Sequence, residues 1–146
     1  MELLIAGKYD DNNYRYFFEK RSYELGVSDN VRLLGPVNEY EKSWYLNYCR
    51  AFAFPSISEG FGLPVVEAMS CGKPLFLSDR TALPEIGGDV SFYFRDFNPD
   101  HIEQVFMNGM EKYNANGLRE KIRERSNHFC WQKAAKQYLE VYRSLY

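Results

Sequence analysis

Short apolar runs alternate with segments of helical character along this chain, and this alternation restricts its fold more than any other feature. Each run stops at a glycine, a proline or a polar residue, as short buried strands do. Strands that alternate with helices form βα units, so the pattern predicts an α/β fold: a Rossmann-like parallel sheet with helices on both faces. The expected strands are 3–7, 31–34, 51–54, 74–77 and 91–94. Helices are expected at 12–25, 63–71 and 131–145, with a single helical turn at 83–86. Three further helices are expected: one capped by Asn38, one that begins at 98–100, and a polar one that ends at Arg125.

One junction between a strand and a helix has the composition of a phosphate site. Residues 58–67 combine two glycines, a proline and two acids, and they follow the third expected strand. Ligands of parallel sheets bind beyond the carboxyl ends of the strands, where this junction should lie. Gly60 and Gly62 permit positive φ and a close approach of a ligand to the backbone. Pro64 suits the first turn of a helix, whose free N–H groups and dipole attract an anion.

The two acids of this junction extend the site on either side of the phosphate. Glu67 lies in the first turns of the expected helix, and helical side chains lean toward the amino end, so its carboxylate can reach ribose hydroxyls. Glu59 can reach another part of the same ligand. A sugar nucleotide, with hydroxyls at both ends and phosphate between them, would use all of these groups. Two other interpretations stay open: Glu67 as a solvent-facing residue stabilised by the helix dipole, and Glu59 as an ordinary acid in a turn.

Residues 59–67 resemble the E-x7-E signature of the retaining GT-B glycosyltransferases, the large group often called family 4 or group 1. The glutamates have the required spacing, and Gly-Phe-Gly-Leu-Pro follows the first in the expected order. The similarity covers nearly the whole chain and implies the C-terminal half of a GT-B fold, with its first strand expected to be missing. The other similar segments are 31–37, 54–56, 78–86 and 131–139.

The resemblance implies a role for each residue of the motif. Glu59 would be the catalytic residue, contacting the transferred sugar and supporting the charge that develops at the reacting centre. Glu67 would bind the ribose hydroxyls. Such enzymes usually need neither a metal nor a cofactor, because helix dipoles and basic side chains stabilise the leaving diphosphate. Backbone groups near the sugar and the diphosphate would come from Gly60, Phe61, Gly62 and Leu63, and Pro36 and Val37 would lie against the nucleobase.

One departure from the family pattern concerns the cations that hold the diphosphate. The family places an Arg and a Lys before the strand that corresponds to 3–7, and this chain starts after that point. Lys73 and Arg80 are the nearest cations in sequence, and both are expected on the rim. We therefore expect residues 1–146 to form a single nucleotide-sugar-binding domain, a fragment of a two-domain enzyme whose N-terminal acceptor domain is missing.

Two functions follow from the resemblance. The first is a retaining glycosyltransferase of hexosyl or mannosyl type, which transfers a sugar from a UDP-, GDP- or ADP-linked donor to a saccharide or glycolipid acceptor, as in polysaccharide biosynthesis. The alternative is a non-catalytic nucleotide-sugar-binding subunit that acts only with a partner chain.

Composition and charge argue against several other classes of protein. A net charge of −2 gives nucleic-acid binding little support. Cys49, Cys71 and Cys130 form no CxxC pair, which argues against a disulfide framework or a zinc site and favours a reducing compartment. His101 and His128 are isolated and are expected at the surface or at helix ends. We expect a cytoplasmic protein, with peripheral association of the full-length enzyme at the inner membrane face compatible with the family.

Overall fold

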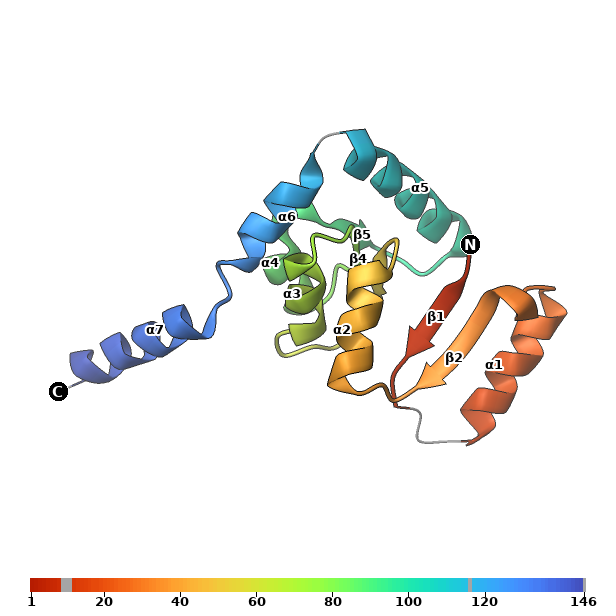
Figure 1. The fold of residues 1–146 in the computed structure, drawn as a ribbon, viewed down its shortest axis with the longest axis horizontal. Helices are drawn as coiled ribbons and strands as arrows, with labels where there is room; N and C mark the ends of the chain where they lie inside the picture. The colour runs from red at the N-terminus through yellow and green to blue at the C-terminus, as the bar shows by residue number, and fades with distance from the viewer. Residues whose placement is uncertain (9–11, 116, 146) are drawn as a thin grey trace. The chain divides into compact units, whose positions relative to one another are not determined.

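The chain has an α/β fold made of two compact units (Figure 1). The computed structural model describes residues 1–8, 12–115 and 117–145. The first unit is Met1–Trp44 and the second is Tyr45–Tyr146. The expectation of a single domain stays a prediction.

The first unit contains a parallel pair of strands. β1 (Leu3–Ala6) pairs with β2 (Val31–Gly35), and between them come α1 (Asn12–Glu24) and the short 3-10 helix η1 (Ser28–Asn30). We expected β1 to be buried, and this expectation is wrong: within the chain only Ile5 of this strand is partly shielded.

Most apolar side chains of the segment 12–25 are also exposed. Helical spacing predicts one inward face made of Tyr14, Phe17, Phe18 and Leu25. Phe18 is half-buried, but the other three have more than half of their surface exposed. A sheet of two strands offers these side chains too little surface to bury against. The strand and helix boundaries in this unit follow local sequence, whereas burial depends on what covers the elements.

α2 (Glu39–Tyr48) begins in the first unit with the predicted cap at Asn38. The Asn38 Oδ1 atom accepts a hydrogen bond from the Glu41 N–H (2.9 Å), and the Glu41 Oε2 atom accepts one from the Asn38 N–H (2.9 Å). This reciprocal pair is a capping box, which satisfies two N–H groups that a helix end leaves without partners.

The second unit is built on a parallel sheet of three strands in the order β3-β4-β5. These strands are β3 (Phe52–Phe54), β4 (Leu75–Ser78) and β5 (Phe92–Phe94). In the central strand β4 all four residues are buried. Because the strands are parallel, the loops that follow them all leave the sheet at the same edge.

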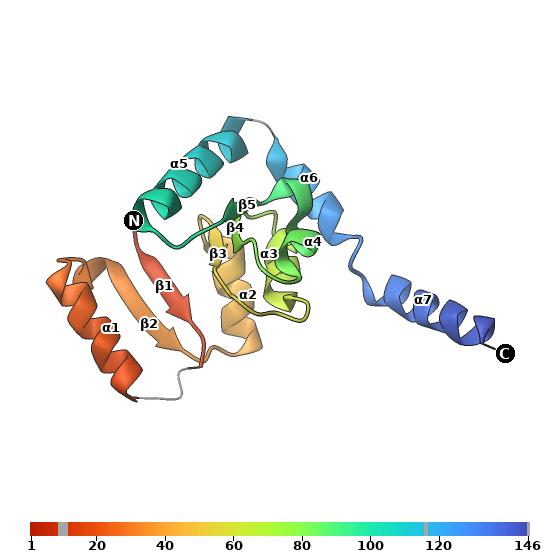
Figure 2. The ribbon, with the colours of Figure 1, turned by 180° about the vertical axis from the view of Figure 1, so that it is seen from behind.

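Helices cover both faces of this sheet, as the sequence predicts. On one face Leu75 and Leu77 pack with side chains of α3 (Leu63–Ser70), α4 (Leu83–Gly87) and α6 (Leu118–Ser126). The 3-10 helix η2 (Gly88–Val90) adds Val90 to this core. Phe76 points to the other face. Figures 1 and 2 show the sheet lying between α5 and α3 in opposite views.

α5 (Pro99–Ala115) packs on the face occupied by Phe76. The helical spacing of four apolar residues in this segment predicts that they point inward, and all four pack in this core. The helix backbone approaches the sheet closely at Gly109, where a Cβ atom would lie 2.6 Å from Phe76 Cε1 and 2.8 Å from two ring atoms of Phe92. The inward side chains are Ile102, Val105, Phe106 and Met110.

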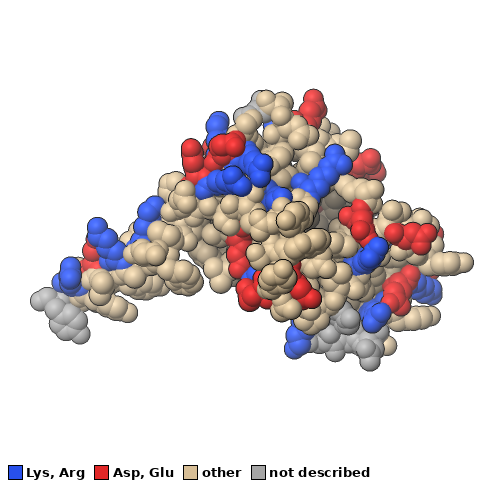
Figure 3. All heavy atoms as spheres, viewed as in Figure 1, with Lys and Arg blue, Asp and Glu red and all other residues tan. Residues whose placement is uncertain are grey.

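The last helix, α7 (Trp131–Ser144), leaves its aromatic stripe exposed. The spacing of Trp131 and Tyr142 on one stripe of the helix predicts that they belong to a core. This prediction is wrong for this helix, because Trp131 is 75% exposed and Tyr142 is 58% exposed. Among the helices of the described residues, none combines the length and the apolar character that crossing a membrane requires. Figure 3 shows acidic and basic side chains mixed over the face in view.

Candidate functional site

The loop between β3 and α3 starts its helix as the sequence predicts. Gly62 is the N-cap residue and has a φ of 94°, a left-handed conformation that favours glycine, and Pro64 lies in the first turn. A Cβ atom at position 62 would lie 3.0 Å from the Leu83 Cδ2 atom. The backbone conformation therefore favours glycine here, and an added side chain would also press on the Leu83 side chain.

Gly60 differs from Gly62 in both respects. Its φ is not positive, so the backbone does not use the left-handed conformation that glycine permits at this position. A Cβ atom at this position would meet no other atom of the described chain within 4 Å. The fold itself does not require glycine at position 60, and the close approach of a ligand to this residue stays a prediction.

The amide of Glu59 is held by the loop that follows β4. The Glu59 N–H donates to the Thr81 Oγ1 atom at 3.0 Å, across 22 positions of sequence. The same two loops are joined a second time, because the buried Ser78 hydroxyl donates to the Ser56 carbonyl oxygen. The carboxyl edge of the sheet therefore fixes where Glu59 lies, and its side chain is half-buried there.

A stack of side chains supports the other side of the loop at Phe61. The Phe61 ring meets the edge of the Phe129 ring, with 5.8 Å between the centroids. The Arg125 guanidinium lies 5.9 Å from the centroid of Phe129 and donates to the carbonyl oxygens of Ile86 (2.7 Å) and Glu85 (2.6 Å) in α4. Arg125 thus joins a core helix to the ring that supports the loop.

The role of Arg125 is not apparent from its local sequence. The stretch 119–125 mixes charges of both signs at helical spacing, which predicts a solvated face. This prediction is wrong for Arg125, which is half-buried and bonded. The available signal was Phe129, an aromatic residue four positions after the arginine, close enough for a cation to cover the ring.

Glu67 lies on α3 with a partly shielded carboxylate. The residue is half-buried, and its Oε2 atom is shielded from solvent. The interpretation of Glu67 as a freely solvated residue therefore does not describe this side chain. Hydrogen bonds to a shielded carboxylate are stronger than those to a solvated one, because the local dielectric constant is lower.

Pro36 and Val37 belong to the first unit and follow β2. The preceding Gly35 has a φ of 73°, so the chain turns there through a left-handed residue. Pro36 is exposed and Val37 is half-buried. An exposed proline beside the turn can offer its ring to a base, and this contact stays a prediction.

The two cations nearest the motif in sequence have partners within the fold. The Lys73 Nζ atom donates to the carbonyl oxygens of Asn47 (2.7 Å) and Cys49 (3.0 Å) at the end of α2. Burial raises the pKa of the Cys49 thiol, although the charge of Lys73 opposes this effect. Arg80 forms an ion pair with Asp79 at 3.2 Å. Lys73 therefore stabilises a helix end, where a positive charge is favourable.

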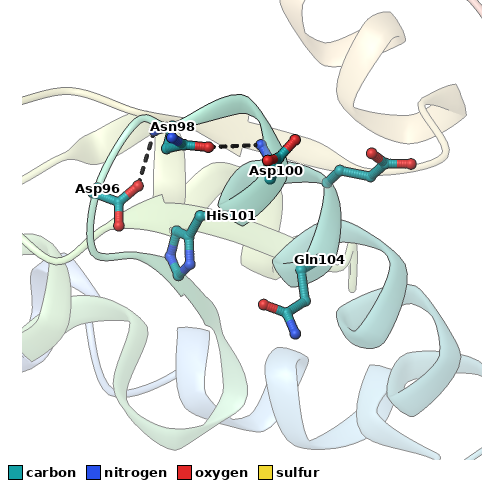
Figure 4. A pocket seen from close by; sticks show the side chains of 6 residues that line it. Asp96, Asn98, Asp100, His101 and Gln104 are labelled. Carbon is teal, nitrogen blue, oxygen red and sulfur yellow. Dashed lines mark hydrogen bonds between the residues drawn. The ribbon is translucent and has the colours of Figure 1, made fainter.

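A hollow of about 660 Å³ lies where β5 leads into α5 (Figure 4). Some of its polar side chains accept hydrogen bonds from the backbone: Asp96 accepts from the Asn98 N–H at 2.9 Å, and Asn98 accepts from the Asp100 N–H at 3.0 Å. His101 accepts from the Arg95 N–H, which confirms the expected place of this histidine at a helix end. Within residues 1–8, 12–115 and 117–145, no group of three or more His, Cys, Asp or Glu could hold a metal ion. A reaction without a metal stays a prediction.

Comparison with known proteins defines the class of this fold. It resembles sucrose-phosphate synthase from Thermosynechococcus elongatus, with a TM-score of 0.83 at 24% identity over 99% of this chain and 38% of that one. It also resembles Anabaena HepE in complex with UDP and glucose, with a TM-score of 0.78 at 19% identity over 98% of this chain and 40% of that one. The fold is that of the C-terminal domain of GT-B glycosyltransferases.

The sequence comparisons then give the family. Residues 1–129 match the glycosyl transferases group 1 family, and the chain belongs to it. It is 31% identical over 119 residues to O-antigen chain mannosyltransferase B of Escherichia coli, covering 79% of this chain and 30% of that protein. It is 30% identical over 151 residues to the MMP alpha-(1->4)-mannosyltransferase of Mycolicibacterium hassiacum, covering 97% and 35%. The chain thus spans about a third of the length of these relatives.

Proposed function

We propose that this chain is the nucleotide-sugar-binding domain of a retaining glycosyltransferase, which transfers a sugar from a nucleoside-diphosphate donor to a saccharide or glycolipid acceptor. The observation that carries the proposal is the β3–α3 junction, where a left-handed Gly62 begins a helix at the carboxyl edge of a parallel sheet. Helix amino ends at this edge bind phosphate groups through backbone N–H groups and the helix dipole.

In this proposal each part of the junction has its own task. The amino end of α3, with the backbone N–H groups of 61–63, holds the diphosphate and stabilises the charge that develops on it as the sugar leaves. Glu67 accepts hydrogen bonds from the ribose hydroxyls. Glu59 contacts the sugar and stabilises positive charge at its anomeric carbon.

Mannose is the sugar that we propose to test first. The two relatives compared above are named as mannosyltransferases, and each is about 30% identical to this chain. A solved neighbour of similar fold holds UDP and glucose. The preference of the chain for a nucleobase is therefore to be tested with uridine, guanosine and adenosine nucleotides in parallel.

Titration calorimetry with UDP, GDP and ADP tests the proposal. We expect this chain to bind at least one of them weakly, because Lys73 and Arg80 have partners elsewhere and backbone N–H groups supply the phosphate contacts. We also expect the chain alone to transfer no sugar from the matching nucleotide sugar. Failure to bind any of the three at millimolar concentration would contradict the proposed site.

A pair of glycine substitutions separates the fold from ligand binding. Gly60→Ala should change the free energy of unfolding by less than about 0.5 kcal/mol, because the new methyl group meets no atom of the described chain. It should nevertheless weaken nucleotide-sugar binding, since the methyl group occupies space that the ligand needs.

Gly62→Ala is the matched control. It should lower the free energy of unfolding by about 1–2 kcal/mol, because alanine is unfavourable at a φ of 94°. Thermal unfolding and calorimetry of both variants check the pair. Unchanged binding by a folded Gly60→Ala variant would mean that no ligand approaches this residue.

A further inference from the structure

Thr81 adopts a backbone conformation that is unusual for its side chain. Its φ is 48°, and it is the one residue other than glycine with a positive φ in the described part of the chain. Left-handed conformations are strained for β-branched residues, and glycine or asparagine is the usual choice at such a position. A threonine here therefore needs a reason that backbone conformation does not provide.

The hydroxyl group of Thr81 supplies that reason. Its Oγ1 atom accepts a hydrogen bond from the Glu59 N–H at 3.0 Å. Because a β-branched side chain has few χ1 rotamers, the hydroxyl is already directed before the bond forms. Glycine would relieve the strain at position 81, but it would remove the acceptor.

The loop that carries Thr81 is itself anchored to the sheet. Ser78, the last residue of β4, is fully buried and donates to the Ser56 carbonyl oxygen. The Ser78 hydroxyl also accepts from the Arg80 N–H at 3.4 Å. Thr81 therefore links the buried end of β4 to the backbone amide of Glu59. The position of this amide limits where the Glu59 carboxylate can lie.

We propose that Thr81 is a positioning residue of the nucleotide-sugar site, whose hydroxyl fixes the Glu59 backbone so that the Glu59 carboxylate faces the transferred sugar. This inference rests on the proposed function. It extends that function by assigning selectivity for the sugar, as distinct from the nucleotide, to a hydrogen bond between two loops. Thr81 itself need not touch the ligand.

Three substitutions at Thr81 separate the hydroxyl from the backbone strain. Thr81→Ser keeps the hydroxyl, Thr81→Val keeps the shape but removes it, and Thr81→Gly removes it while relieving the strain. Each variant of the full chain is titrated with UDP-glucose, GDP-mannose and ADP-glucose, and with the corresponding nucleoside diphosphates. Its thermal midpoint and the hydrogen-exchange rate of the Glu59 amide are measured as well.

We expect the variants to lose affinity for the sugar part of the ligand and to keep their affinity for the nucleotide part. Thr81→Val and Thr81→Gly should bind the preferred nucleotide sugar about threefold to tenfold more weakly, a range typical of one hydrogen bond, and should bind its nucleoside diphosphate within twofold of the unmodified chain. Thr81→Ser should retain the affinity. The Glu59 amide should exchange faster in the Val and Gly variants. The thermal midpoint of Thr81→Gly should not fall below that of Thr81→Val, so a loss of stability would not explain its weaker binding.

Three outcomes would overturn the inference in different ways. If Glu59→Gln weakens nucleotide-sugar binding but Thr81→Val and Thr81→Gly do not, Glu59 keeps its proposed role and Thr81 loses its own. If Glu59→Gln has no effect on a chain that binds the nucleotide sugar, the role proposed for Glu59 fails, and the role of Thr81 fails with it. Equal weakening of sugar nucleotide and free nucleotide by Thr81→Val would also contradict a role confined to the sugar.

Discussion

Replacing Glu67 with alanine is expected to weaken nucleotide binding by about 1.5–3 kcal/mol, which is about tenfold to a hundredfold in the dissociation constant. The reason is the loss of hydrogen bonds between a charged, partly shielded carboxylate and the ribose hydroxyls of the ligand. Titration calorimetry with the best-bound nucleoside diphosphate checks this expectation.

Two further variants make the test of Glu67 specific. Glu120→Ala removes one negative charge from an exposed position on α6 and should leave the affinity unchanged, which excludes a general effect of net charge. The 2′,3′-dideoxy form of the nucleotide should bind the unmodified chain more weakly and should bind Glu67→Ala with no further loss. A folded Glu67→Ala variant with unchanged affinity would instead favour a purely structural glutamate.

Replacing Gly109 with valine is expected to lower the free energy of unfolding of the second unit by about 2–3 kcal/mol. A side chain at this position meets the rings of Phe76 and Phe92 at distances shorter than van der Waals contact. Phe76 is fully buried and stacks on both Phe92 and Phe94, so its ring cannot move aside without disturbing the sheet. Urea unfolding followed by circular dichroism measures the effect.

Asn108→Val is the matched control for this substitution. It places the same β-branched side chain one residue earlier on the same helix, at an exposed position. Its effect should stay within about 0.5 kcal/mol. Similar losses for the two variants would show that helix propensity, and not the close packing of α5 on the sheet, determines the stability at this position.

Much of the fold follows from local sequence. The apolar runs gave the five strands, and Asn38, Gly62 and Pro64 gave two of the helix starts, because these features act on the residues next to them. Burial was harder to predict. Trp131 and Tyr14 have the spacing of inward residues, but an apolar side chain is buried only where another element covers it, and the period of a helix does not specify that element.

In the candidate site, too, the features that depend on neighbouring residues could be predicted, and those that depend on distant residues could not. The glutamates, the glycines and the proline of 59–67 are adjacent in sequence, so their arrangement around one helix start could be predicted. Thr81 and Arg125 could not be found in this way. The first reaches its partner across 22 positions and the second across about 40, and the pairing depends on which strands become neighbours in the sheet.

The place of α3 between two adjacent strands has a consequence for folding kinetics. β3 and β4 are parallel neighbours, so the segment joining them must cross over the sheet before they can pair, and closing that connection costs chain entropy. Residues 55–62 begin this crossover. A refolding chain should therefore gain its affinity for nucleotide together with the pairing of β3 and β4. Lengthening the loop before Gly62 should slow refolding more than it accelerates unfolding, and stopped-flow measurements of both rates would detect this difference.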